Sequence, residues 1–167
     1  MIKILKNIQD ELEGSIYTIF TSFKRNLNID YNSIENYIDF LHQNNAKVFY
    51  VMPYNSRYSQ LREKEIFKLN EFCIKKIKSL TGSRIIVSDS IHGPTDLKKE
   101  YCLHAKENGA DIFASICREK YFSNDQILRH YEEMNKCKTP LLVHVMPFLS
   151  GYDVKNMNWP YKIFDGL

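Results

Sequence analysis

The sequence predicts an α/β fold built on a parallel sheet, and three observations lead to this class. Short segments rich in β-branched and aromatic residues alternate with longer segments whose apolar residues recur at helical spacing. The strand-like segments are continuous apolar runs, which is typical of strands that helices cover on both faces. No Gly-rich phosphate loop follows any of these runs, so a nucleotide-binding Rossmann sheet is disfavoured.

The first unit of this pattern begins after Gly14. Residues 16–20, Ile-Tyr-Thr-Ile-Phe, are rich in strand-forming types, and Asp30 can cap the helix that follows. Residues 47–52 form the next apolar run, which Pro53 ends. We therefore expect a strand, a helix and a second strand in this part of the chain.

The middle of the chain repeats the pattern with a longer helix. Residues 62–80 place apolar side chains on one face and charged ones on the other, as in a helix with a solvated side. Residues 84–88 read as a third strand. A helix is expected from Thr95 or Asp96 to about residue 108, where Gly109 is a suitable stop.

The last third supplies two more strands. Residues 111–116 and 141–146 are apolar runs, with a helix expected over 124–136 between them and a helical segment over 159–167. Five strand–helix units in 167 residues are roughly five-eighths of a (β/α)8 barrel, which takes about 250 residues. Three possibilities stay open: an open doubly wound sheet, a piece of a barrel, or a barrel that partners complete.

Composition narrows the classes of partner. The chain has 23 Lys and Arg against 20 Asp and Glu, a net charge of +3. That excess is too small to predict a nucleic-acid or membrane partner. No apolar run approaches the ~20 residues that cross a bilayer, and the first residues lack the apolar core of a secretory signal. We therefore expect a cytoplasmic protein.

The cysteines do not predict a metal site. No Cys-x-x-Cys pair is present, and the gaps between the four cysteines do not fit a zinc site. Buried thiols are the simplest interpretation. The sequence predicts neither a metal nor a cofactor.

A series of short motifs nonetheless resembles one known family. The motifs lie in order between residues 14 and 165. They are Gly14-Ser-Ile-Tyr-Thr-Ile-Phe, Ile29-Asp30, Leu61-Arg-Glu-Lys-Glu, Arg84-Ile-Ile-Val, His104-Ala-Lys-Glu-Asn-Gly-Ala-Asp and Pro140-Leu-Leu-Val-His-Val-Met-Pro-Phe-Leu-Ser-Gly. Together they resemble the dihydrodipicolinate synthase / N-acetylneuraminate lyase family of pyruvate-dependent aldolases.

The resemblance implies a TIM (β/α)8 barrel of which the chain holds about the first five units. Residues 1–13 would be an N-terminal lead and residues 14–167 a partial barrel domain. The resemblance also implies a Schiff base between pyruvate or another 2-oxo acid and a lysine on the sixth strand. In the family a tyrosine on the fifth strand relays the proton, a Gly-Thr-Thr-Gly-Glu motif binds the substrate carboxylate, and homo-oligomers are common.

The chain departs from the family at these functional places. Pro53-Tyr-Asn-Ser-Arg57 stands at the Gly-Thr-Thr-Gly-Glu motif, so the glycines are lost. Tyr54 and Asn55 can still donate hydrogen bonds to a substrate. His144 stands at the relay tyrosine, and a histidine can relay protons near neutral pH. The position of the sixth-strand lysine lies beyond Leu167, so the chain is expected to be truncated before it.

These residues lead to a functional hypothesis. The resemblance implies a lyase or aldolase of this family that acts on pyruvate or another 2-oxo acid, with His144 as catalytic residue and Tyr54 and Asn55 as substrate contacts. The alternative is a catalytically inactive barrel homologue that binds or regulates. Taken alone, His144 could also be a core histidine with a satisfied hydrogen bond. After the third strand, Asp89 and Ser90 are further candidates for the polar rim.

Overall fold

The computed structural model describes residues 8, 10, 12–90, 93–117, 123–144 and 165. Across these residues one parallel sheet runs through the molecule in the order β1-β2-β3-β4-β5. Its strands are β1 (Ile16–Thr18), β2 (Val48–Val51), β3 (Arg84–Ser88), β4 (Ile112–Ser115) and β5 (Leu141–Val143). The parallel sheet expected from the apolar runs is confirmed.

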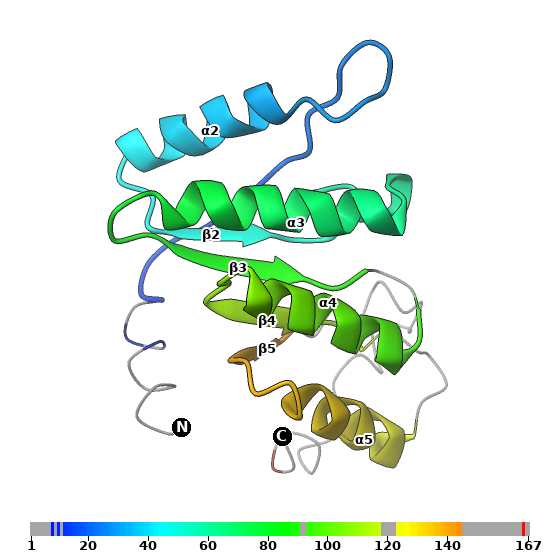
Figure 1. Ribbon diagram of the computed structural model, residues 1–167. Coiled ribbons are helices and arrows are strands. Elements are labelled where there is room, and N and C mark those ends of the chain that lie inside the picture. Colours follow the sequence, from blue (N-terminus) through cyan, green and yellow to red (C-terminus); the bar gives the residue numbers. More distant parts are fainter. Residues whose placement is uncertain are drawn as a thin grey trace, which may run out of the picture.

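Helices connect the strands and lie together on one side of the sheet (Figure 1). They are α2 (Tyr31–Gln43), α3 (Glu63–Lys78), α4 (Thr95–Glu107) and α5 (Asn124–Asn135), with a short 3₁₀ turn, η1 (Tyr58–Gln60), before α3. A doubly wound sheet reverses its strand order and carries helices on both faces. Sequential order with helices on one face is instead how a (β/α)8 barrel begins, so the chain forms part of a TIM barrel.

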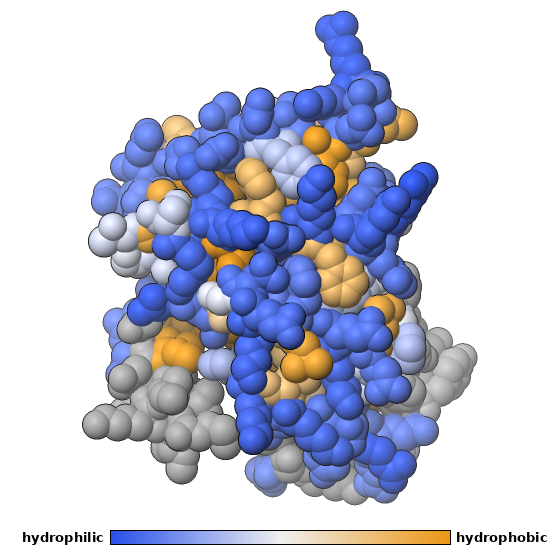
Figure 2. Space-filling view, viewed as in Figure 1, coloured by the Kyte–Doolittle hydropathy of each residue, from blue (hydrophilic) through white to orange (hydrophobic). Residues whose placement is uncertain are grey.

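The helix-facing side of the sheet holds the larger core. Alternate strand residues, among them Phe49, Ile85 and Phe113, point toward α2, α3 and α4 and are fully buried. The opposite faces of the helices are solvated, and the surface on this side is largely hydrophilic (Figure 2). The amphipathic pattern of residues 62–80 is thereby confirmed in α3.

The other side of the sheet is the concave face of the partial barrel. Its buried apolar residues form a separate and smaller cluster, against which Ile8 and Leu12 pack. The buried members of that cluster are Val48, Tyr50, Ile86, Ile112 and Ala114. Residues that precede β1 in the chain therefore pack against the strands on this concave face.

Local signals account for where the helices begin and end. Asp30 caps α2, with its carboxylate 3.4 Å from the Ser33 backbone nitrogen. Gly109 takes a φ of +88° after α4, which a glycine adopts without strain. β5 stops at Val143, three residues before the expected end at 146. Residues 145–150 lie outside the described part of the chain, as do most of the 1–13 lead and all but residue 165 of the 159–167 segment.

Candidate functional site

Polar side chains gather at the carboxyl ends of the strands on the concave face. Side chains alternate between the two faces of a strand, and Val48 and Leu142 belong to the concave cluster. Thr18, Tyr50 and His144 therefore point to the same side. Active sites of (β/α)8 barrels are built at this end of the strands.

Tyr50 and His144 join β2 to the end of β5 across this face. The Tyr50 hydroxyl lies 3.0 Å from Nδ1 of His144, although 94 residues separate them. The His144 backbone nitrogen also donates to the carbonyl oxygen of Ser115 at 3.1 Å. In a flat sheet β2 and β5, three spacings apart, would be roughly 14 Å from one another. The direct contact therefore requires the inward curvature of a barrel.

Asn55 reaches the same end of the sheet from the turn after β2. Its amide nitrogen donates to the Thr18 hydroxyl at 2.7 Å. Two further bonds fix the turn to the segment that follows β1. The Ser56 hydroxyl donates to the Ile19 carbonyl and the Thr21 hydroxyl donates to the Ser56 carbonyl, each at 2.6 Å. The Ser56 side chain and backbone thus hold Asn55 against β1.

Tyr54 lies in the same turn and is more exposed. As a whole residue it is 37% accessible to solvent. Its carbonyl accepts from the backbone nitrogen of Arg57, which sits in the left-handed region with φ +53°. Of the two expected substrate contacts, Asn55 thus lies beside Thr18 and Tyr54 is a surface residue.

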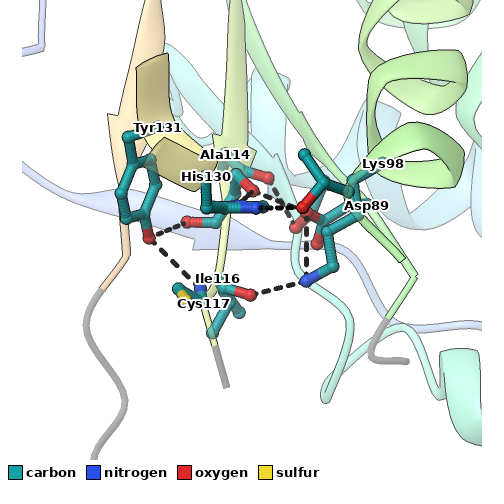
Figure 3. Close-up of polar contacts among 10 residues, drawn as sticks. Asp89, Lys98, Ala114, Ile116, Cys117, His130 and Tyr131 are labelled. Atoms are coloured by element: carbon teal, nitrogen blue, oxygen red, sulfur yellow. Dashed lines mark hydrogen bonds and ion pairs between the residues drawn. The ribbon is translucent and has the colours of Figure 1, made fainter. Parts of the chain in front are cut away.

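A second polar cluster lies on the helix side of the sheet, between β3, β4, α4 and α5 (Figure 3). Asp89 and Ser115 are fully buried, and the Ser115 hydroxyl donates to Oδ2 of Asp89 at 2.7 Å. Lys98 extends its Nζ to 3.7 Å from the same oxygen and donates to the Ile116 carbonyl at 2.7 Å. The buried carboxylate is thus neutralised by a buried ammonium.

His130 completes this cluster from α5. Its Nε2 lies 3.2 Å from the Ser115 hydroxyl and its Nδ1 lies 3.0 Å from the Thr95 hydroxyl. Because the Asp89 carboxylate only accepts, Ser115 donates to it and receives its own hydrogen bond from Nε2–H. Thr95 then donates to Nδ1. Burial, with the nearby Lys98 ammonium, lowers the pKa of His130 to about 4, so the ring is neutral at pH 7.

Sequence reasoning placed Asp89 on the polar rim of the barrel mouth, and the structure corrects this. Asp89 lies on the helix side, where its partners come from α4 and β4. Lys98 and His130 were missed because each falls within a helix that reads as half solvated. The signal that could have found them is Asp89 itself, since a carboxylate directly after a buried strand needs a cation or a donor nearby.

The thiols behave as packing groups. Cys73, Cys102 and Cys137 are buried. Burial raises the pKa of Cys73 and of Cys102 to about 12. Among the described residues, no group of three or more His, Cys, Asp or Glu side chains could hold a metal ion. Within the same part of the chain, no helix is long and apolar enough to span a membrane.

Comparison with known proteins gives matches to solved structures only. No family model and no curated protein matches the chain. YagE, a prophage protein of the dihydrodipicolinic acid synthase family from E. coli K12 in complex with pyruvate, superposes with a TM-score of 0.76 at 20% identity. That match covers 86% of this chain and 48% of YagE. The chain has the fold of dihydrodipicolinate synthase.

Two further structures agree with this assignment. CdNal from Clostridium difficile, in complex with mannosamine, matches with a TM-score of 0.76 and 17% identity over 92% of this chain and 53% of its own. Dihydrodipicolinate synthase from Aquifex aeolicus matches with 0.72 and 22% over 81% and 45%. The chain spans about half the length of these proteins. The resemblance found in the sequence motifs is therefore confirmed for the fold.

Proposed function

We propose that the protein is an aldolase or lyase that acts on pyruvate or another 2-oxo acid through a Schiff base, with His144 as its proton relay. The observation that supports this most is the place of His144. It stands where the family has its relay tyrosine, and its ring lies on the concave face in contact with the Tyr50 hydroxyl. This contact keeps the ring at the carboxyl ends of the strands, where barrel active sites are built.

The proposed reaction needs a nucleophilic amine, a proton relay and a contact for the substrate carboxylate. A lysine amine adds to the ketone carbon, water leaves, and the resulting iminium withdraws electrons from the neighbouring carbon. Loss of a proton from that carbon gives the enamine that attacks, or is released from, a second carbonyl compound. His144 would carry the protons, and Asn55, with Tyr54 at the rim, would contact the substrate carboxylate.

Lys98 is not a candidate for the nucleophile. It is the most buried lysine of the described residues, but it lies on the helix side of the sheet and faces Asp89. An amine that donates to the Ile116 carbonyl and pairs with the Asp89 carboxylate is held on the helix side, away from the concave face. The nucleophilic lysine would come from the sixth strand, as in the family.

Deuterium exchange tests the proposal without knowledge of the second substrate. The full-length protein should catalyse exchange of the pyruvate methyl protons in D₂O, because the enamine regains a deuteron from solvent. Borohydride added with pyruvate should leave a covalent adduct on one lysine. His144→Gln should slow exchange by ~10² or more, as expected for loss of a general acid–base group. The proposal would be contradicted if the unmodified protein showed no methyl exchange and no trapped adduct.

The second candidate is a barrel that binds a small acid without turnover. The loss of the glycines around Tyr54 and Asn55 favours it, since backbone can no longer approach the ligand as closely there. Thermal stabilisation by pyruvate without methyl exchange would support this alternative. In either case we propose a cytoplasmic protein that forms a homo-oligomer and has no nucleic-acid or membrane partner.

A further inference from the structure

The hydrogen bond between Tyr50 and His144 determines more than the position of the histidine. A neutral imidazole has one N–H and one acceptor nitrogen, and the partner of one nitrogen fixes the state of the other. The Tyr50 hydroxyl is 3.0 Å from Nδ1, and the two rings lie 5.9 Å apart at 50°. When Nδ1 accepts a hydrogen bond from this hydroxyl, the proton of the neutral ring is on Nε2.

The surroundings favour the tyrosine as the donor. A phenol is the more acidic partner and an imidazole nitrogen the more basic one, so O–H···N is the preferred direction. Tyr50 is buried in the concave cluster, where its neighbours include the apolar side chains of Val48, Ile86 and Ala114. A poorly solvated site also strengthens a well-aligned hydrogen bond.

We propose that Tyr50 is a positioning residue that holds His144 in its Nε2–H tautomer, so that the neutral ring meets a bound 2-oxo acid as a hydrogen-bond donor to its carbonyl oxygen. The ligand in this statement rests on the proposed function, whereas the tautomer does not. A neutral histidine that donates to a carbonyl polarises it for attack by an amine. Tyr50 would supply this state before any substrate arrives.

Nitrogen NMR of the histidine rings tests the tautomer directly. The protein is labelled with ¹⁵N-histidine, and long-range ¹H–¹⁵N spectra are recorded above pH 8, where exposed histidines are neutral. The chain has five histidines, and the signals missing in His144→Gln identify His144. We expect an acceptor-type Nδ1 and a protonated Nε2 in the unmodified protein. In Tyr50→Phe both nitrogens should move toward averaged values, because the ring then samples both tautomers.

Tyr58→Phe is the matched control. Tyr58 is also a buried tyrosine, and its hydroxyl donates to Asn70 on the helix side of the sheet. Tyr58→Phe should lower the stability about as much as Tyr50→Phe does, and it should leave the His144 signals unchanged. A protonated Nδ1 in the unmodified protein would overturn the proposal even if Tyr50→Phe failed to fold. So would an unchanged His144 spectrum in a folded Tyr50→Phe.

Pyruvate separates this proposal from the function on which its ligand rests. In the full-length protein, Tyr50→Phe should slow methyl exchange about tenfold or more with a smaller change in KM. If the unmodified protein shows no exchange, the proposed function fails, and the NMR experiment still decides the role of Tyr50. If exchange occurs and Tyr50→Phe leaves its rate unchanged, the positioning role fails while the function stands.

Discussion

The lysines of α4 show how neighbours decide what a residue does. Lys98 and Lys99 are adjacent in sequence, but the Lys98 side chain is 7% exposed and the Lys99 side chain 28%. Lys98 faces the fully buried Asp89, whereas Lys99 pairs at the surface with Glu133, 3.2 Å away. Breaking a buried pair leaves an uncompensated charge, and breaking a surface pair leaves a solvated one.

Replacement of Lys98 should therefore be far more costly than replacement of Lys99. Lys98→Met keeps the length of the side chain and should lower the free energy of unfolding by about 3–5 kcal/mol. Lys99→Met, the matched control, should lower it by less than about 1 kcal/mol. Asp89→Asn introduced into Lys98→Met should restore part of the loss. Urea denaturation measures all of these, and equal costs for the two lysines would contradict the assigned pairing.

At the scale of elements, His130 holds α5 against the rest of the fold. It connects α5 to β4 through Ser115 and to α4 through Thr95. Tyr131, the next residue, donates to the Ser115 carbonyl at 3.2 Å and accepts from the Cys117 backbone nitrogen at the same distance. The position of α5 therefore depends on a ring that must remain neutral to accept from Thr95.

This dependence predicts a loss of stability in mild acid. The pKa of His130 is lowered from 6.5 to about 4 in the folded protein, so the unfolded chain takes up the proton first. The contribution of His130 to the free energy of unfolding is fully present above pH 6.5 and is lost as the pH falls toward 4. The loss over that window is up to about 3 kcal/mol. His130→Gln should flatten the pH dependence between 6.5 and 5, where ordinary carboxylates remain ionised. Urea denaturation across this range that gave equal slopes for the two proteins would refute the prediction.

Individual elements were largely predictable from local sequence. The apolar run over residues 84–88 coincides with β3, and the Asp30 cap and the Gly109 stop act where the pattern indicated. Each of these signals involves residues within one turn or one strand. Asp89 was misplaced because the face on which a side chain lies after a strand ends depends on partners from other elements, here Ser115 and Lys98.

At the scale of the whole molecule, strand order and curvature are what create the site. The sequential order of strands explains why Tyr50 and His144 meet across two intervening strands. No local pattern predicts that contact, because it depends on the inward bend of the sheet. The position of His144 was found through the resemblance to a family, whereas Tyr50, an apparent strand residue, was not singled out.

The same architecture predicts how the 167-residue chain behaves by itself. Among the described strands, β1 and β5 each pair on one side only. Within β1, Ile16 is 43% exposed. An uncovered edge with apolar side chains is a template for pairing with another chain, so the isolated chain should self-associate as its concentration rises. Sedimentation velocity over a range of concentrations measures this.

Ile16→Lys should weaken that association, because a charge on an edge strand opposes further pairing. Phe40→Lys is the matched control: Phe40 is 61% exposed but belongs to α2, on the helix side, so its replacement should have no such effect. If both variants weaken association equally, the contact is a general apolar one and not the sheet edge. A monomer at every concentration would mean that the concave face and its edges are already covered within the chain. The partial barrel would then be a self-sufficient unit, and its site would have to work without further strands.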